Sequence, residues 1–245
     1  MKNNKLLIFL FKFFIVILFL SCVYIFIKEE KPRQDKLPKQ VESVTLKQKT
    51  RADLPKVTVD DWQLLLVNKE HKKEDLQVEL ADINGFKVDK RIADATAEFL
   101  AAAQAIDPQE HILAAYRSLE EQNQLYHSYV EQEIANNPSL NQEAAEALVQ
   151  AYFPLGGASE HQTGLAIDMS TVDALNQSDQ QVVKKVAEVA PKYGFVLRFP
   201  EDKKDVTGRN YEDWHYRYVG KKSAQYMTKN HLSLEEYLAI LKEKK

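Results

Sequence analysis

An apolar run close to the N-terminus most limits how this 245-residue chain can fold. Residues 6–27 are apolar apart from three positions, and a helix of this length spans about 33 Å, enough to cross the hydrocarbon core of a bilayer. The short flank before the run carries only positive charge, so the positive-inside rule places the rest of the chain outside the cytoplasm. Residues 1–27 are therefore predicted to be a single-pass membrane anchor or an uncleaved signal.

Cys22 leaves a second interpretation of this segment open. The string Phe19-Leu20-Ser21-Cys22 loosely resembles a lipobox, in which the cysteine would carry a lipid. The apolar run continues past Cys22 to Ile27, which a lipoprotein does not need, so the anchor is favoured. The chain has one cysteine, which excludes a disulfide framework, a cysteine-based zinc finger and a cysteine nucleophile after this segment.

Residues 28–56 are predicted to be a disordered, charged tether. They contain three prolines and no aromatic residue or glycine, so they cannot bury enough apolar area to offset the entropy lost on ordering. Of the formal net charge of −3, residues 1–27 carry +3 and residues 28–56 carry +4, which leaves −10 for residues 57–245. Such an acidic domain argues against a nucleic-acid partner, because phosphate binding needs clustered basic charge.

Residues 57–245 are predicted to form one folded domain of the α+β class. Some segments have the apolar pattern of strands and others have the spacing of amphipathic helices. The predicted strands are 62–67, 113–116, 164–170, 195–199 and 214–219; the predicted helices are 88–105, 119–134, 142–152, 182–190 and a last helix that opens with the capping box Ser233-Leu-Glu-Glu236. The order lacks a strict βαβ rhythm, so we expect a small antiparallel sheet flanked by helices.

Two of the six histidines have neighbours that suggest chemistry. His161 lies in a glycine-containing loop, seven residues before Asp168. Asp168 itself is on the polar face of a predicted strand. Farther along the chain, Glu212 precedes His215 by three residues. Two histidines and one carboxylate form a three-ligand zinc set that leaves a fourth position for water, and Glu212 would be available as a general base. A surface or capping pair remains the alternative, because Glu-x-x-His alone arises often by chance.

Both blocks together resemble the VanY-type D-alanyl-D-alanine carboxypeptidases, zinc peptidases of bacterial cell walls in family M15, which also includes the streptococcal-type L,D-carboxypeptidases. The resemblance rests first on Ser-x-His-x-x-Gly-x-Ala-x-Asp over 159–168 and on Glu-x-Trp-His-x-Arg-Tyr-Val-Gly over 212–220. It extends through shorter strings over most of 57–245: Trp62-Gln-Leu-Leu-Leu-Val-Asn68, Tyr116-Arg117-Ser118, Tyr193-Gly194-Phe195, Thr207-Gly208 and Ser233-Leu-Glu-Glu-Tyr237.

The resemblance assigns roles to individual positions. It implies a zinc site in a cleft and a catalytic base. It also implies an arginine that stabilises the developing oxyanion, and polar groups that hold the substrate. The matching positions are His161, Asp168 and His215 for zinc, Glu212 for the base, Arg117 for the oxyanion, and Gln122, Ser118 and Ser159 for the substrate.

The implied activity is release of the C-terminal D-alanine from peptidoglycan stem peptides during cell-wall maturation, without an acyl-enzyme. A peptidoglycan endopeptidase and a non-catalytic wall-binding module on the same scaffold are the alternatives. The sequence also leaves open whether the enzyme trims pentapeptides (D,D) or tetrapeptides (L,D). The charge of −10 slightly favours the tetrapeptide, because acidic groups could meet the amine of its penultimate residue.

Overall fold

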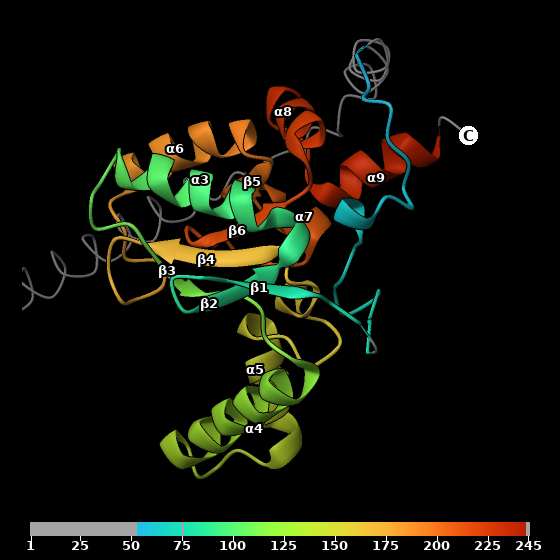
Figure 1. Cartoon of the computed structure of the whole chain (residues 1–245). Coiled ribbons are helices and arrows are strands. Elements are labelled where there is room, and N and C mark those ends of the chain that lie inside the picture. The colour runs from blue at the N-terminus through green and yellow to red at the C-terminus, as the bar shows by residue number, and fades with distance from the viewer. Residues whose placement is uncertain (1–52, 75, 244–245) are drawn as a thin grey trace, which may run out of the picture. The chain divides into compact units, whose positions relative to one another are not determined.

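A four-stranded antiparallel sheet forms the centre of the computed structural model, which describes residues 53–74 and 76–243. Its strands follow the order β3-β4-β6-β5, so β4 and β6 are the inner pair. The bounds are β3 (His111–Ala114), β4 (Ala166–Ser170), β5 (Phe195–Leu197) and β6 (His215–Tyr218). The α+β class, with small antiparallel sheets and flanking helices, is therefore confirmed (Figure 1).

One face of this sheet is covered by α3 (Ala93–Gln104) and α6 (Gln180–Val189), as Figure 1 shows. The alternation of β4 sends Ile167 and Met169 into the core beneath these helices and Asp168 to the opposite face. Phe99 of α3 stacks on Phe195 of β5 with ring centroids 5.0 Å apart. The apolar core thus fixes the strand register that places Asp168.

The second apolar cluster joins the sheet to α8 (Lys221–Lys229) and α9 (Leu234–Lys242). The predicted strand 62–67 is wrong: the segment forms the 3-10 helix η1 (Trp62–Leu64) and then an irregular stretch. Leu64 is buried in this cluster. The carbonyl oxygens of Gln63 and Leu65 accept hydrogen bonds from Arg217 rather than from a neighbouring strand.

The predicted helix 88–105 begins too early, because a hairpin precedes it. Strands β1 (Leu80–Ile83) and β2 (Phe86–Asp89) are joined by Asn84 and Gly85, both with positive φ. Asn-Gly favours the type I′ turn that matches the twist of paired strands, so the sequence did hold a signal for this hairpin. The short helix η2 (Lys90–Ile92) then leads into α3.

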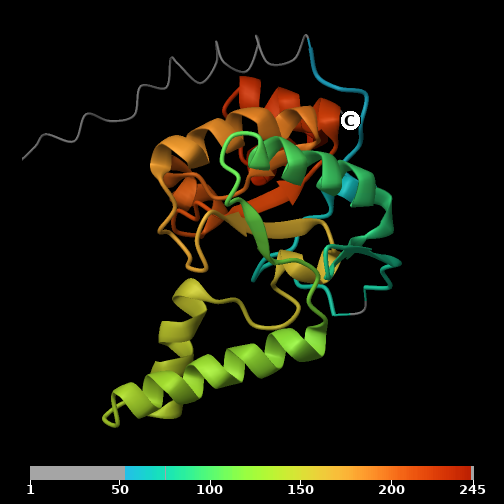
Figure 2. The same ribbon diagram turned by 60° about the vertical axis from the view of Figure 1, so that its left-hand side comes forward.

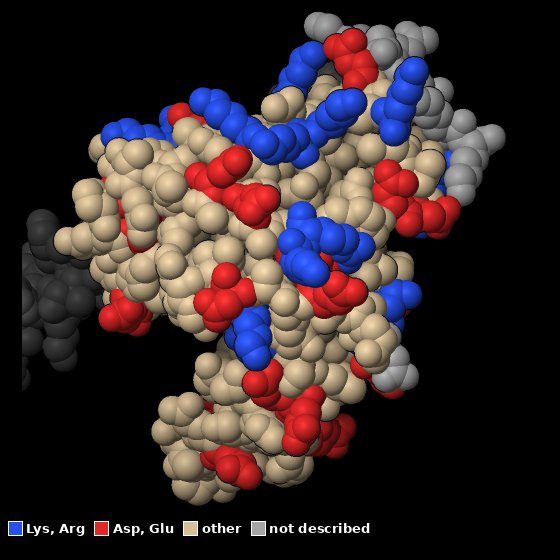
Figure 3. Space-filling model, viewed as in Figure 1, with Lys and Arg blue, Asp and Glu red and all other residues tan. Residues whose placement is uncertain are grey.

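A pair of helices stands on the other side of the sheet from α3 and α6 (Figure 2). They are α4 (Leu119–Asn136) and α5 (Gln142–Tyr152), close to the predicted bounds. Tyr126 and Val130 of α4 pack against Ala145 and Val149 of α5. Residues 119–152 contain six glutamates and no lysine or arginine, and Figure 3 shows acidic side chains on this hairpin.

Short elements complete the described part of the chain. They are η3 (Glu160–Thr163), η4 (Ala190–Lys192), η5 (Glu201–Lys203) and α7 (Lys204–Thr207). The predicted capping box of the last helix is confirmed, since Ser233 and Glu236 bond each other's backbone at the start of α9. No helix within the described residues is long and apolar enough to span a bilayer. The predicted anchor (1–27) lies outside the described residues, as does the tether apart from its last four residues, 53–56, so both stay predictions.

Candidate metal centre

Three side chains from separate elements meet on the polar face of the sheet. His161 comes from η3, Asp168 from β4 and His215 from β6, and each offers one ligand atom within 4.8 Å of the others. Nε2 of His161 lies 3.2 Å from Oδ2 of Asp168, and Nδ1 of His215 lies 2.8 Å from Oδ1. All three residues are buried. The structure thus brings together the three residues that the sequence predicted as ligands.

Backbone geometry explains why these residues converge. Asp168 and His215 are direct partners in the pairing of β4 with β6. His161 reaches them from a 3-10 turn that ends at Gly164, whose φ is +67°. A Cβ at Gly164 would lie 2.7 Å from the backbone nitrogen of Asp89, so only glycine fits this close approach in a left-handed conformation.

The ring of His161 is held in one orientation by a backbone carbonyl. Its Nδ1 lies 2.7 Å from the carbonyl oxygen of Ala115. A carbonyl oxygen only accepts, so Nδ1 carries the hydrogen and donates it. In the neutral ring the lone pair is then on Nε2, which faces Asp168. A partner of this kind fixes the tautomer of a metal-binding histidine.

His215 is held in the same manner by a carboxylate. Its Nε2 lies 3.3 Å from Oε2 of Glu160, so Nδ1 is the nitrogen turned toward Asp168. The ring of Phe199 stacks on the imidazole at 5.2 Å. Burial would lower the pKa of His215, but the hydrogen bonds with Asp168 and Glu160 outweigh burial and raise this pKa to about 9. The electrostatic field of the cluster therefore favours positive charge.

Glu160 belongs to a buried ion-pair network that the sequence did not predict. Its Oε1 accepts hydrogen bonds from Nε of Arg198 and Nη1 of Arg217, both at 2.9 Å. Arg198 also makes two hydrogen bonds with the carboxylate of Glu235. Burial would raise the pKa of Glu160, but the two guanidinium groups hold it well below its ordinary value. The ionised carboxylate can thus orient His215 at every moderate pH.

Glu212 is buried but is not one of the three converging residues. Its Oε1 accepts hydrogen bonds from Nε and Nη2 of Arg209, at 3.1 and 2.5 Å. Its charge also contributes to the raised pKa of His215. The position, next to the cluster but outside it, suits the base that the sequence predicted better than a fourth ligand.

Arg117 and Gln122, which were predicted to have separate roles, contact each other. Nη1 of Arg117 donates to Oε1 of Gln122 at 2.7 Å, and the Gln122 amide donates to the carbonyl oxygen of Pro154. The backbone nitrogen of Arg117 bonds the carbonyl oxygen of His161. Burial lowers the pKa of the Arg117 guanidinium, and the charge of Asp168 opposes this. The arginine is therefore fixed close to the metal-binding cluster.

The two predicted serines differ in their contacts. Ser118 caps α4, and its hydroxyl is bonded to the backbone and carboxylate of Glu121. Ser159 is buried immediately before η3, and its side chain makes no capping hydrogen bond there. Ser118 is thus engaged in helix capping, and the substrate-binding roles of both serines stay predictions.

Comparison with known proteins agrees with this geometry. Residues 85–221, more than half of the chain, match the model of the VanY family, described as D-alanyl-D-alanine carboxypeptidase. The chain belongs to the VanY family. The resemblance seen in the sequence is thereby confirmed.

Two characterised members show how far the VanY likeness extends. The D-alanyl-D-alanine carboxypeptidase of Enterococcus faecalis is 34% identical over 180 residues, which cover 73% of this chain and 66% of that protein. A bifunctional D-Ala-D-Ala dipeptidase and carboxypeptidase of Enterococcus gallinarum is 32% identical over 57% of this chain and 72% of its own length. The match thus spans just under two thirds of the first relative.

Solved structures of the VanY type share the fold. VanYB in complex with D-alanine-D-alanine is 32% identical, covers 73% of this chain and 98% of its own, and superposes with a TM-score of 0.65. A D,D-pentapeptidase VanY in complex with Zn(II) gives a TM-score of 0.63 at 32% identity, with 73% and 99% coverage. The LD-carboxypeptidase LdcB gives 0.56 at 32% identity, with 76% and 93% coverage.

The donor set of this VanY chain fits a zinc ion. Two imidazole nitrogens and one carboxylate oxygen are the ligands of many catalytic zinc sites. Tetrahedral coordination at bonds of about 2.0–2.1 Å separates neighbouring ligand atoms by about 3.3 Å. Nε2 of His161 and Nδ1 of His215 lie 3.2 and 2.8 Å from the two oxygens of Asp168, and one ligand atom from each of the three residues lies within 4.8 Å of the others. Binding of a small divalent cation would bring these atoms to the tetrahedral spacing.

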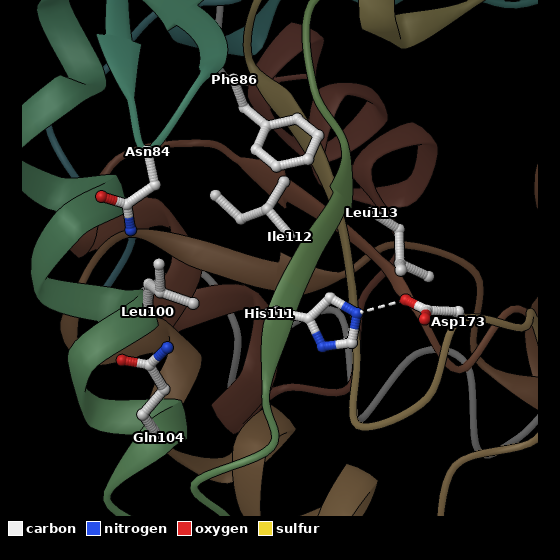
Figure 4. A pocket seen from close by; sticks show the side chains of 8 residues that line it. All are labelled: Asn84, Phe86, Leu100, Gln104, His111, Ile112, Leu113 and Asp173. Carbon is white, nitrogen blue, oxygen red and sulfur yellow. Dashed lines mark hydrogen bonds and ion pairs between the residues drawn. The ribbon is translucent and has the colours of Figure 1, made fainter.

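Two cavities lie away from this centre. One of about 420 Å³ is an open hollow between α3, the Asn84 turn and β3, and Figure 4 shows His111 lining it, paired with Asp173 at 2.8 Å. The other, of about 320 Å³, lies behind the ligand loop between Trp62, Arg91 and Thr163. None of the candidate site residues lines either cavity. The site is identified by its converging donors.

Proposed function

We propose that this chain is a zinc-dependent carboxypeptidase that releases the C-terminal D-alanine from peptidoglycan stem peptides. The observation that carries the proposal is the buried cluster of His161, Asp168 and His215, with the acidic Glu212 next to it but outside it. Membership of the VanY family supports the substrate class, since two relatives are named for D-alanyl-D-alanine carboxypeptidase activity. One similar structure holds zinc and another holds D-alanine-D-alanine.

Each side chain of the site has its own role in the proposed hydrolysis. A zinc ion held by the three ligands would lower the pKa of a water molecule to about 7 and polarise the scissile carbonyl. Glu212 takes the proton from the attacking water and delivers it to the leaving amine. The guanidinium of Arg117, held by Gln122, stabilises the negative charge that develops on the carbonyl oxygen. Ser159 and Gln122 hold polar groups of the peptide, and Ser118 acts through the start of α4.

The substrate of the proposed enzyme is either a pentapeptide stem, cleaved by D,D activity, or a tetrapeptide stem, cleaved by L,D activity. The relatives named for D-alanyl-D-alanine carboxypeptidase activity favour a pentapeptide and D,D cleavage. The six glutamates of the α4–α5 hairpin favour a tetrapeptide and L,D cleavage, because they could attract the amine of the penultimate diamino acid. LdcB, named as an LD-carboxypeptidase, has the same fold. Either form requires the same zinc ligands, base and arginine.

Mass spectrometry of matched synthetic stems tests the proposal. The full-length protein, loaded with zinc, is expected to shorten the penta- or tetrapeptide by one D-alanine, and the Glu212→Gln variant is not. A rate ratio of more than about tenfold, equivalent to roughly 1.4 kcal/mol, decides between the two peptides. Fragments cut inside the stem would instead identify an endopeptidase. Tight binding of the stem without cleavage would identify a wall-binding module.

The proposal includes a location on the outer side of the cell membrane. The apolar run of residues 6–27 supports a single-pass anchor, and the charged residues 28–56 support a tether to the wall. Metabolic labelling with a tagged fatty acid is expected to leave the protein unlabelled. Label that appears on the wild type but not on Cys22→Ser would replace the anchor with a lipid on Cys22.

A further inference from the structure

Among the described arginines near the metal-binding cluster, Arg209 has not yet been given a role. It does not orient a metal ligand, and it is not the residue assigned to the oxyanion. Arg198 and Arg217 are almost fully buried and are paired with Glu160. Arg117 is bonded to Gln122 and is assigned to the oxyanion. Arg209 is different because 21% of its side chain remains exposed. Its guanidinium is therefore accessible to an arriving ligand.

The position of the Arg209 guanidinium is well defined. The turn after α7 places the residue, since Gly208 adopts a φ of +69° and the backbone nitrogen of Arg209 donates to Oγ1 of Thr207. Its Nε and Nη2 both bond one oxygen of Glu212, and Nη2 also donates to the carbonyl oxygen of Tyr152. One side of the guanidinium is thus fixed between the segment before β6 and the end of α5.

The other edge of the guanidinium has donors to spare. A guanidinium carries five N–H donors, and within the described residues no hydrogen bond involves Nη1 of Arg209. Cζ of Arg209 lies over the ring of Phe199, 5.7 Å from its centroid, and this ring also stacks on His215. A planar cation with unused donors recognises a carboxylate well.

The chemistry of the leaving group connects Arg209 to the substrate. In the proposed function Glu212 delivers a proton to the amine of the departing D-alanine, so this amine lies beside Glu212. The terminal carboxylate is attached to the same Cα as the amine and must lie close to the residues that contact Glu212. Arg209 is in direct contact with Glu212.

We infer that Arg209 binds the terminal carboxylate of the substrate while it holds Glu212 in place. This inference rests on the proposed function and names the group that makes a free C-terminus necessary. An internal peptide bond, or a C-terminal amide, offers no negative charge to this guanidinium. Arg209 is therefore a specificity-determining residue that separates carboxypeptidase from endopeptidase cleavage.

Steady-state kinetics on a stem peptide and its C-terminal amide test the inference. Because Arg209 also holds Glu212, Arg209→Gln is expected to slow cleavage of both peptides. Loss of a hydrogen bond to a charged group costs about 10- to 100-fold, so kcat/KM on the free acid is expected to fall by that further factor relative to the amide, chiefly through KM. Arg209→Lys is expected to restore part of the preference for the acid. Lys204→Gln, which removes a nearby exposed charge in α7, is the matched control.

Two further outcomes separate this inference from the proposed function. If Arg209→Gln slows both peptides equally, or keeps the preference for the acid, Arg209 does not bind the carboxylate, although the carboxypeptidase activity stands. If the wild type cleaves neither peptide, the proposed activity is wrong, and the inference is then tested by binding. Calorimetry measures the affinity of both peptides for zinc-loaded Glu212→Gln, with and without Arg209→Gln. A preference for the acid that is lost in the Arg209→Gln variant supports the inference, whereas equal affinity of Glu212→Gln for the acid and the amide overturns it. Circular dichroism of each variant excludes unfolding.

Discussion

Asp168 and His215 lie directly opposite each other on β4 and β6, and Oδ1 of Asp168 is 2.8 Å from Nδ1 of His215. These two donors are 47 residues apart in the sequence, yet the strand register alone brings them together. Two of the three metal-ligand residues are therefore positioned by paired strands, so a small sheet needs only one loop to complete the site. Only His161 depends on a loop, and Gly164 fixes its approach.

The first prediction concerns metal content. The wild type is expected to hold one zinc ion per chain. His161→Ala and His215→Ala each remove one of the three ligands, so each variant is expected to lose most of its zinc. Elemental analysis after dialysis measures the ratio of zinc to protein. Glu212→Gln serves as the control and is expected to retain its zinc. Full occupancy in the His161→Ala/His215→Ala double variant would contradict the ligand assignment.

A second prediction separates the base from the ligands. Glu212→Gln keeps an acceptor for Arg209 but cannot take a proton, so kcat is expected to fall by about 10²- to 10⁴-fold. The zinc content and the unfolding temperature should stay close to those of the wild type. Single-turnover release of D-alanine measures the loss. A variant that loses its zinc along with its activity would show that Glu212 is a ligand.

The third prediction concerns Glu160, which orients His215. Glu160→Gln should weaken zinc binding by about 10- to 100-fold, as changes to the partners of metal-binding histidines do. It also leaves Arg198 and Arg217 without their shared carboxylate, which should cost about 3–5 kcal/mol of the free energy of unfolding. Competition with a chelator gives the affinity and denaturant titration the stability. The exposed Glu201→Gln is the control, and zinc affinity equal to the wild type would count against the role of Glu160.

A fourth prediction uses a buried carboxyl outside the centre. Burial raises the pKa of Glu110 to about 7, and among the described residues its buried Oε2 has no hydrogen-bond partner. The folded state therefore holds the proton more tightly than the unfolded state, so this residue lowers stability as pH rises from about 4.5 to 7. Glu110→Gln should stabilise the protein by up to about 3 kcal/mol above pH 7.

Denaturant titration of Glu110→Gln and the wild type at pH 8 and pH 4 checks the sign. At pH 4 residue 110 is largely neutral in both variants, folded or unfolded, so the difference should nearly vanish. The same gain at both pH values would mean that the substitution acts through packing and not through ionisation.

The sequence predicted the metal ligands because their residue types and spacings form a compact pattern. It could not predict the contacts of Glu160. The partners of Glu160 are Arg198 and Arg217, 38 and 57 residues away, and no local pattern reports such a distance. The segment 62–67 was misjudged for a similar reason, since its apolar run suits a strand, but the guanidinium of Arg217 binds its carbonyl groups.

Two hydrogen bonds connect the segment after β3 to the ligand loop: the Ala115 carbonyl accepts from His161, and the Arg117 backbone nitrogen donates to the His161 carbonyl. This double connection comes immediately before α4, which begins at Leu119. The α4–α5 hairpin thus begins just after a segment that two hydrogen bonds already hold to the loop of His161. Beyond the first turn of α4, where Gln122 holds Arg117, the length and sequence of the hairpin can change without displacing the three ligand residues. The hairpin is thus a replaceable module through which one catalytic centre could be adapted to different wall peptides.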